Sequence, residues 1–386
     1  MIAVIADDFT GAAEIGGVGL RYGLNVLIET VVNKVEGVDL LIIATDTRSM
    51  SQEAASEEVA NITSQLMNLG LKLIFKKIDS VLRGHIATEL EALMCTANKN
   101  RAVIVAANPI GGRKIVKGQY FVDSLLLNET SFVDDPDFPV HSACVTEIVH
   151  SSVFPVFSIG LNEKLPDAGL IIADVNSHEE LYDWAVMVDD EMVVAGGSGF
   201  FDALLSIIYC KNGVIAHADL SFGESSLFVF GSMFPKHASM LAKFDKYRVV
   251  RMNMPKGIYN DSDECAALLD DWSLQVVDQL KNGCSVMLTI DHLPGNEVGL
   301  SLRLRESIGQ LVAKVQNKFD LSDLFIEGGA TTSVVLKYLN INKLHPFNEA
   351  EFGVIQMKAD GYPNLCITTK PGSYQWPDHL VFEKAK

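Results

Sequence analysis

Two adjacent carboxylates stand near the start of the chain in a spacing that can do chemistry. Asp7 and Asp8 follow the apolar run Ile2–Ile5, and Thr10 and Gly11 come shortly after them. If that run is a buried strand, the pair lies at its end, and the N–H groups that open the next helix are free to meet an anion or a hydroxyl. Adjacent carboxylates there could bind hydroxyls, hold a metal or accept a proton. The simpler alternative is an aspartate that caps the helix.

A second charged motif follows the apolar run Leu71–Phe75. Lys77, Asp79 and Ser80 come first, and Arg83 follows Ser80 by about one helical turn. In that geometry Asp79, Ser80 and Arg83 could face one pocket, with Arg83 offering a planar fork suited to a carboxylate. A capping serine beside a surface arginine is the alternative. The pocket is favoured because Asp79 lies near the first acidic pair if the two strands are neighbours.

Glycine and hydroxyl residues recur at three expected strand ends in the C-terminal half of the chain. Gly328–Ser333 follows the strand expected at Leu324–Ile326, Gly231 and Ser232 follow another, and Lys370–Ser373 follows a third. Turns of this kind present backbone N–H groups to a phosphate, and Lys370 could add a point charge. Capped turns with a surface lysine are the alternative at each place.

Several common catalytic signatures are absent from the sequence. It has no Walker motif, and Gly17 and Gly19 are followed by Gly23, one residue too late for a dinucleotide fingerprint. An oxidoreductase is therefore a weak alternative. The histidines show no ligand spacing for a tightly held zinc, and no GxSxG motif supports a serine hydrolase.

The pattern of the whole chain predicts an α/β fold. With 386 residues, two domains are expected, with a ligand cleft between them. Short apolar runs alternate with helical segments, of which 51–69 is the clearest, so each domain should hold a mainly parallel sheet flanked by helices. A polar stretch at 208–226 suggests a boundary near residue 220, giving domains 1–220 and 221–386. The segment 108–140 breaks the alternation, and its aromatic residues favour an ordered, functional excursion.

The net charge and the cysteine spacing limit which partners and which cellular environment are expected. The net charge of −18 argues against nucleic-acid and acidic-membrane partners, so an anionic ligand must meet local cations. The six cysteines are far apart and form no CxxC pair, which is typical of reduced core residues. No secretory leader or membrane span is recognisable, so a cytoplasmic protein is expected. A homodimer is expected only because dimers are the commonest assemblies.

These motifs together resemble the four-carbon acid sugar kinase family, formerly described as a domain of unknown function. The resemblance covers nearly the whole chain, and its motifs occur in the family's order. They are DD-x-TG at 7–11, K-x-DS-x-LRG at 77–84, GR…V-x-G-x-Y at 112–120, a GSAGL-like turn at 197–200, a GS-x-S-like loop at 231–234, GG-x-TS at 328–333 and K-x-G-x-Y at 370–374.

The resemblance implies a substrate-binding N-terminal domain and a nucleotide-binding C-terminal domain. The sugar-acid site is then expected at Asp7, Asp8, Thr10, Lys77, Asp79, Ser80 and Arg83, with Asp8, Asp79 and Arg83 as the catalytic group. The ATP site is expected at Ser232, Gly328, Gly329, Ala330, Thr331, Thr332, Lys370, Gly372 and Ser373.

The implied activity is ATP-dependent phosphorylation of the terminal hydroxyl of threonate, erythronate or 3-oxotetronate, with Mg²⁺ as a second cofactor. The partners are then a small sugar acid and ATP. In the loop after Ser232 the chain carries Met233 and Phe234 where the family has small and hydroxyl residues. That departure supports one alternative, a catalytically silent protein that binds or senses the sugar acid.

Overall fold

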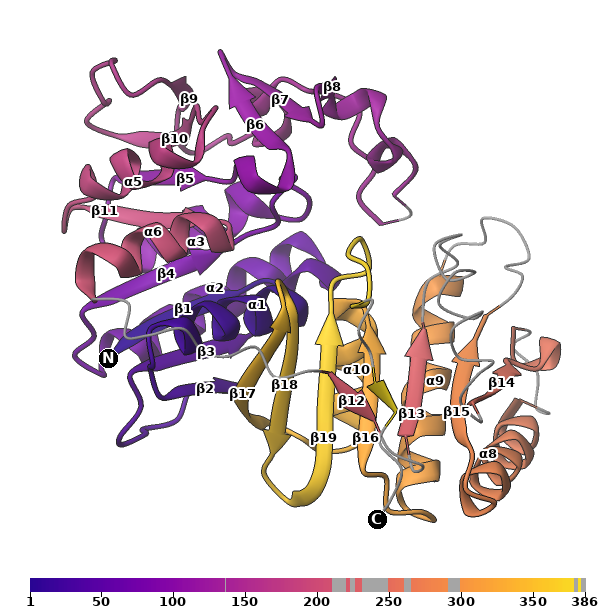
Figure 1. Ribbon diagram of the computed structural model, residues 1–386. Helices are drawn as coiled ribbons and strands as arrows, with labels where there is room; N and C mark the ends of the chain where they lie inside the picture. The colour runs from indigo at the N-terminus through magenta and orange to yellow at the C-terminus, as the bar shows by residue number, and fades with distance from the viewer. Residues whose placement is uncertain are drawn as a thin grey trace. The chain divides into compact units, whose positions relative to one another are not determined.

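The computed structural model describes residues 1–135, 137–209, 220–222, 226–230, 249–259, 265–290, 299–377 and 381–382 (Figure 1). The chain divides into two compact units, Met1–Val214 and Ile215–Lys386. Each holds a mainly parallel sheet flanked by helices, which confirms the predicted α/β fold with two domains. The boundary expected near residue 220 and the cleft between the domains stay predictions.

The sheet of the N-terminal unit is parallel throughout and has the strand order β2-β3-β1-β4-β11-β5-β10-β9. Its central strands are apolar and buried, as expected for a parallel sheet covered on both faces. The strands are β1 (Ile2–Ala6), β2 (Val26–Glu29), β3 (Leu40–Ala44), β4 (Leu73–Lys77), β5 (Arg101–Val105), β9 (Val156–Ile159), β10 (Gly169–Ala173) and β11 (Met192–Gly196).

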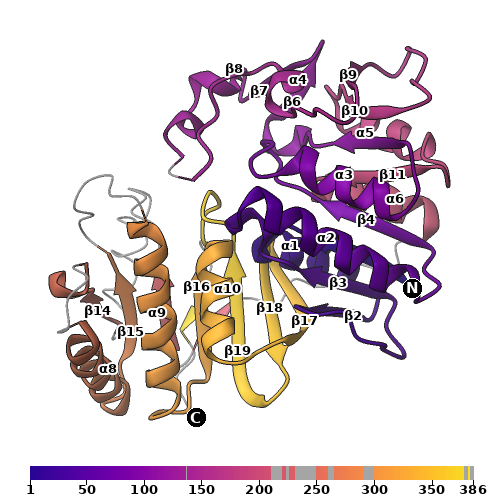
Figure 2. The same ribbon diagram turned by 180° about the vertical axis from the view of Figure 1, so that it is seen from behind.

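Helices cover both faces of this sheet. α1 (Phe9–Arg21) packs against α6 (Ser198–Ile208), which packs against α5 (His178–Val186), while α2 (Gln52–Met67) packs against α3 (Ile86–Thr96) (Figure 2). A short helix, α4 (Val145–Ile148), contacts β9. These contacts group α1, α6 and α5 on one face of the sheet and α2 and α3 on the other. The carboxyl ends of β3, β1 and β4 therefore meet at one edge.

Strand β4 runs two residues further than the apolar run Leu71–Phe75 predicts. It ends at Lys77, and both lysines at its end are buried. The ammonium of Lys76 forms an ion pair of 2.5 Å with Glu89 of α3, and that of Lys77 lies 3.7 Å from Glu14 of α1. Each lysine can continue the buried strand because a helix on its own face supplies a carboxylate.

The excursion 108–140 contains a small antiparallel sheet of its own. It consists of β6 (Arg113–Val116), β7 (Gln119–Val122) and β8 (Leu125–Leu126), in that order. Short 3₁₀ turns flank it at Pro109–Gly111, Leu127–Glu129 and Ser131–Asp134. The buried ring of Tyr120 anchors this sheet to the unit, because its hydroxyl donates to the carbonyl of Ser80.

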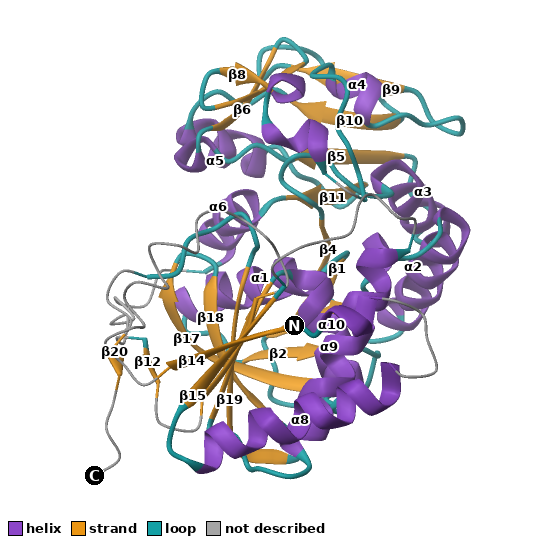
Figure 3. Ribbon diagram, turned by 90° about the vertical axis from the view of Figure 1, so that its right-hand side faces the viewer, coloured by secondary structure: helices purple, strands orange, loops and turns teal. Residues whose placement is uncertain are grey.

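The C-terminal unit has the strand order β14-β15-β13-β16-β19-β18-β17, parallel as far as β19 and antiparallel beyond it. Figure 3 shows α8 (Cys265–Lys281), α9 (Leu300–Gln316) and α10 (Gly329–Tyr338) along one side of these strands. The strands are β13 (Ser226–Phe230), β14 (Val249–Asn253), β15 (Ser285–Thr289), β16 (Asp323–Glu327), β17 (Lys343–Glu351), β18 (Val354–Ala359) and β19 (Tyr362–Lys370). A 3₁₀ turn lies at Lys256–Tyr259.

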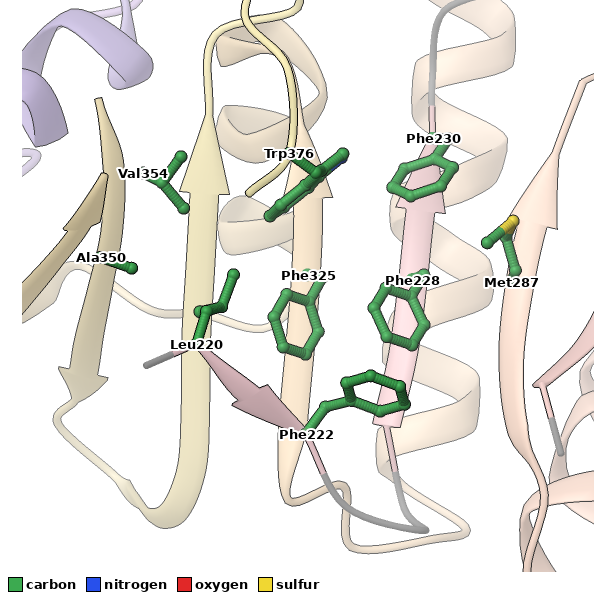
Figure 4. Close-up of a cluster of buried hydrophobic side chains, with 9 residues drawn as sticks. All are labelled: Leu220, Phe222, Phe228, Phe230, Met287, Phe325, Ala350, Val354 and Trp376. Carbon is green, nitrogen blue, oxygen red and sulfur yellow. The ribbon is translucent and has the colours of Figure 1, made fainter. Parts of the chain in front are cut away.

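An aromatic cluster covers the opposite face of this sheet (Figure 4). Phe228 and Phe325 stack with their ring centroids 4.6 Å apart, and Phe222 meets Phe228 edge to face at 5.2 Å. Phe222 belongs to β12 (Ser221–Phe222), which pairs with β20 (Val381–Phe382). Trp376 closes the cluster, 5.8 Å from Phe325. Residues distant in sequence thus hold the loop after β19 against the sheet.

None of the helices in the described part of the chain has the length and apolar character that a membrane span needs.

Candidate active site

The side chain of Asp8 caps helix α1 at the end of β1. Its Oδ1 accepts a hydrogen bond of 2.8 Å from the N–H of Gly11, and the Thr10 hydroxyl donates to its Oδ2 at 2.5 Å. A Cβ at position 11 would lie only 2.6 Å from Oδ1, so glycine is needed for this close approach. The capping alternative is therefore realised. It leaves room for a ligand role, since an ionised carboxylate has about four lone-pair sites.

Arg48 is the cation at the centre of the site, although no sequence motif pointed to it. Its Nε and Nη2 donate to Oδ2 of Asp7 at 2.8 and 2.6 Å. Nη2 also lies 3.4 Å from Asp8 Oδ1, and Nη1 lies 3.5 Å from Asp79 Oδ1. Arg48 belongs to the 3₁₀ turn Thr47–Ser49 after β3, the parallel neighbour of β1. A search of every strand end, not only those with conspicuous motifs, would have found it.

The loop after β4 is organised around Asp79. Arg83 grips this carboxylate with two hydrogen bonds, Nε to Oδ2 at 2.9 Å and Nη2 to Oδ1 at 2.8 Å, while its Nη1 donates to Asp135 at 2.7 Å. The backbone N–H groups of Val81 and Arg83 also donate to Asp79. The guanidinium lies 5.3 Å from the ring of Phe132. The fork predicted for a ligand carboxylate therefore binds carboxylates of the protein itself.

The three aspartates at these strand ends differ in the direction of their pKa shifts. Burial raises the pKa of Asp7 above its ordinary value, against the opposing effect of Arg48. Burial acts in the same direction on Asp8 and Asp79, but nearby cations outweigh it and lower both pKa values: Arg48 and Lys77 for Asp8, and Arg83 and Arg48 for Asp79. Asp8 and Asp79 are therefore ionised at neutral pH, and Asp7 holds a proton more readily. The Oδ1 of Asp7 is buried and has no hydrogen-bond partner.

The remaining predicted residues of this unit lie around the same cluster. The ammonium of Lys77 is buried and donates to the carbonyl of Ile78 at 2.9 Å. The hydroxyl of Ser80 accepts a hydrogen bond of 2.6 Å from Nη1 of Arg113. The structure thus brings Asp7, Asp8 and Asp79 together through Arg48, as the neighbouring strands predict. The roles of these residues toward a substrate stay predictions.

Gly84 closes the loop against Arg48, and we expect Gly84→Ala to lower the free energy of unfolding by about 2 kcal/mol. Its φ of +95° lies in the left-handed region, which costs a residue with a Cβ roughly 1–2 kcal/mol. The new Cβ would also lie 3.3 Å from Cγ of Arg48. Denaturant unfolding of both proteins measures the difference.

Gly37→Ala is the matched control, because Gly37 has a φ of +71° and no atom within 4 Å of an added Cβ. It should lose only the conformational part. Equal losses at both positions would contradict the contact with Arg48.

In the C-terminal unit, the loops after β16 and β19 are joined at neighbouring strand ends. The N–H of Gly328 donates to the carbonyl of Lys370 at 2.9 Å, and the hydroxyls of Thr332 and Thr369 lie 3.0 Å apart. Gly328 has a φ of +91°, and an added Cβ there would meet nothing within 4 Å. The first N–H groups of α10, at Gly329, Ala330 and Thr331, have no acceptor within the helix. This end of the unit can therefore offer donors to a phosphate.

Lys370 lies in a different environment from the one expected of a phosphate contact. Its ammonium is buried, 2.9 Å from Oε2 of Glu327, and donates to the carbonyls of Pro371 and Tyr374. Trp376 donates to the same Glu327 oxygen at 3.1 Å, and its ring lies 5.3 Å from the ammonium. This geometry favours a structural ion pair.

Three further residues were predicted to belong to a nucleotide site. Gly372 and Ser373 lie in the loop after β19, where Ser373 is exposed and an added Cβ at Gly372 would meet nothing within 4 Å. Ser232 lies outside the described residues. Their contacts with a nucleotide stay predictions.

The carboxylates after β1 and β4 do not fit a magnesium ion. Arg48 and Arg83 already supply the positive charge that a cation would bring to Asp7, Asp8 and Asp79. In the parts of the chain that the structure describes, no group of three or more His, Cys, Asp or Glu side chains is arranged to hold a metal. No step of the chemistry is therefore assigned to a metal held by these side chains.

Comparison with known proteins gives two family matches that follow the two units. A sugar-binding N-terminal domain matches residues 2–204, more than half of the chain, and a nucleotide-binding C-terminal domain matches residues 227–374.

Named relatives are similar to the chain at modest identity. A D-threonate kinase of Salmonella typhimurium is 35% identical over 42% of this chain, and the match spans only 39% of that protein. A D-erythronate kinase of Heliobacterium modesticaldum is 26% identical over 81% of this chain and 72% of its own length. A 3-oxo-tetronate kinase of Haemophilus influenzae is 23% identical over 99% and 98%.

Solved structures agree on the fold. A Salmonella typhimurium LT2 protein is 18% identical over 97% of this chain and 96% of its own, with a TM-score of 0.76. A Haemophilus influenzae protein of the DUF1537 type is 20% identical over 98% of each chain, with a TM-score of 0.69. At these identities the likeness shows the fold alone. The sugar-binding match covers most of one unit, the nucleotide-binding match covers most of the other, and the similar proteins are named as kinases of four-carbon acids. The chain therefore belongs to the four-carbon acid sugar kinase family.

Proposed function

We propose that this protein is an ATP-dependent kinase that transfers a phosphoryl group to the terminal 4-hydroxyl of a four-carbon sugar acid such as threonate, erythronate or 3-oxotetronate. The observation that carries the proposal is the cluster of carboxylates and arginines at the carboxyl ends of β3, β1 and β4. Ligands of open α/β sheets bind at such strand ends, and paired charges suit a small polyhydroxy acid. Relatives named as kinases of these acids support the reaction class.

In this proposal Asp8 orients the attacking hydroxyl as a hydrogen-bond acceptor. Its lowered pKa keeps it ionised, and its side chain is more exposed than that of Asp7, at 11% against 5%. Phosphoryl transfer depends mainly on position and charge, so an orienting acceptor is sufficient. The oxygen of the hydroxyl forms a bond to the γ-phosphorus, the bond to the ADP oxygen breaks, and the hydroxyl proton leaves to Asp8 or to water.

The nucleotide belongs to the C-terminal unit in this proposal, with its phosphates at Gly328–Thr332. The open space over Gly328 and the first N–H groups of α10 support that position. Mg²⁺ would be carried by the ATP phosphates and would neutralise their charge. A cytoplasmic location and a homodimer are proposed on the sequence alone.

The test measures ADP release with Mg-ATP across D- and L-threonate, D- and L-erythronate, 3-oxotetronates and 4-hydroxythreonine. We expect turnover on one acid, with a product whose phosphorus couples to the C4 protons in NMR. An acyl phosphate, recognised by its reaction with hydroxylamine, would overturn the 4-hydroxyl assignment. The silent binding protein would be favoured if the folded protein turns over none of these acids, and if an acid raises its melting temperature while ATP does not.

A further inference from the structure

The arginines near the acid site differ in what their donors bind. Arg48 donates from Nε and Nη2 to Asp7, and its Nη1 lies 3.5 Å from Oδ1 of Asp79. Arg83 donates from Nε, Nη1 and Nη2 to Asp79 and Asp135. A ligand carboxylate at either arginine would have to displace an aspartate. Such an exchange would leave a buried carboxylate without its cation, which is strongly unfavourable.

Arg113 lies beside the loop after β4, and part of its guanidinium forms no hydrogen bond. Its Nη1 donates to the Ser80 hydroxyl at 2.6 Å, while its Nε is buried without a hydrogen-bond partner. Among the residues that the structure describes, no carboxylate forms an ion pair with its guanidinium. A buried donor without an acceptor is rare in native proteins and calls for an explanation, of which an absent ligand is one.

The backbone fixes Arg113 in place. It starts β6, and it exchanges two backbone hydrogen bonds with Asn108, which lies just beyond the end of β5, at 2.9 and 3.0 Å. The hydroxyl of Tyr120, on the neighbouring strand β7, donates to the carbonyl of Ser80. The excursion 108–140 thus carries Arg113 to the loop after β4, next to Asp79.

We propose that Arg113, together with the hydroxyl of Ser80, binds the carboxylate of the acid substrate. The inference rests on the proposed function and names the part of the substrate that this arginine recognises. The Nε and Nη2 edge of Arg113 is the edge with which Arg83 grips Asp79, so a carboxylate can take the same bidentate geometry there. Arg83 then holds the loop by binding Asp79, and Arg113 selects acids over neutral polyols.

The experiment compares the preferred acid with its neutral carboxamide in the wild-type protein and in Arg113→Gln. A charge-assisted contact should make the wild-type kcat/KM for the acid about 10- to 100-fold higher than that for the carboxamide, and Arg113→Gln should lose most of this preference. The KM for ATP should stay unchanged. Arg113→Lys should keep part of the preference, because it keeps the charge and loses the fork.

Lys114→Gln is the matched control, since it removes the next cation of β6, whose side chain points to the other face of the strand. It should leave the preference intact. In Arg83→Gln the activity falls but the ratio of acid to carboxamide is kept, because a purely structural change affects both substrates alike. A preference that persists in Arg113→Gln, or disappears in Arg83→Gln alone, would overturn the inference.

Calorimetric binding of the acids separates this inference from the proposed function. If the wild-type protein binds an acid but does not turn it over, the kinase proposal fails, and the affinity of Arg113→Gln for acid and carboxamide still decides the inference. If the folded wild-type protein binds no acid of the panel, the inference fails as well.

Discussion

Arg48→Met should lower the free energy of unfolding by about 3–5 kcal/mol, because it leaves buried carboxylates without their cation. Arg48 contacts Asp7, Asp8 and Asp79, and only 17% of its side chain is exposed. With these three groups released, kcat/KM for the acid should fall about 100-fold or more, the effect of displacing positioned groups by about 1 Å. Chemical unfolding and steady-state kinetics measure the two losses.

Arg101→Met is the matched control for Arg48. Arg101 also pairs with an aspartate, but its partner Asp189 is half exposed, and the pair lies at the amino end of β5, away from the site. It should lose little activity. The double variant Arg48→Met/Asp7→Asn should regain part of the stability, because it removes the buried carboxyl group that Arg48 binds with two hydrogen bonds. Strictly additive losses would show that Arg48 does not act through Asp7.

The parts of the fold that the sequence predicts are those in which apolar runs are buried on both faces. The run Leu40–Ala44 is β3 without change, and the helix expected at 51–69 is α2 at Gln52–Met67. The predicted end of β4 was wrong, because Lys76 and Lys77 look like surface residues until the carboxylates of the covering helices are known. Partners that arrive from other elements do not appear in a local pattern.

The antiparallel hairpin of β17 and β18 was missed for a related reason. Its buried positions include Asn348, Glu349 and Gln356, which interrupt the apolar alternation of a strand. Asn348 donates to Gln356 across the hairpin at 2.8 Å. Cross-strand pairing of polar groups lets them be buried, and it becomes visible only once the register is known.

The candidate site was predictable to the extent that strand order follows from the α/β pattern. Asp7, Asp8 and Asp79 meet because β1 and β4 are parallel neighbours. Arg48 stands in a segment without a conspicuous motif, so only the fold identifies it as part of this cluster. Arg113 belongs to a motif at 112–120, but its contact with the loop after β4 appears only in the fold. In the C-terminal unit the glycine turns could be placed from the sequence, but the burial of Lys370 could not, because its partners Glu327 and Trp376 come from two other places in the chain.

Lys370→Met should lower the free energy of unfolding of the C-terminal unit by about 3–5 kcal/mol, since it leaves Glu327 charged and buried beside Trp376. Both side chains are only 1% exposed, so water cannot replace the lost ammonium. The double variant Lys370→Met/Glu327→Gln should regain most of this stability, because the neutral amide can still accept the hydrogen bond from Trp376. Chemical unfolding followed by tryptophan fluorescence gives both values. Lys337→Met, which removes a 70% exposed lysine of α10, is the control and should change little.

The same double variant decides what Lys370 contributes to the nucleotide site. If Lys370 acts through its ion pair, as the burial of its ammonium favours, the double variant regains its affinity for ATP together with its stability. The single variant then has a raised KM for ATP only because the loop that carries Gly372 and contacts Gly328 is loosened. A stable double variant whose KM for ATP stays high would instead require a direct contact between this lysine and a phosphate. Both explanations of Lys370 predict the same stability for the double variant, and they differ only in its KM for ATP. Stability and ATP affinity must therefore be measured on the same preparations.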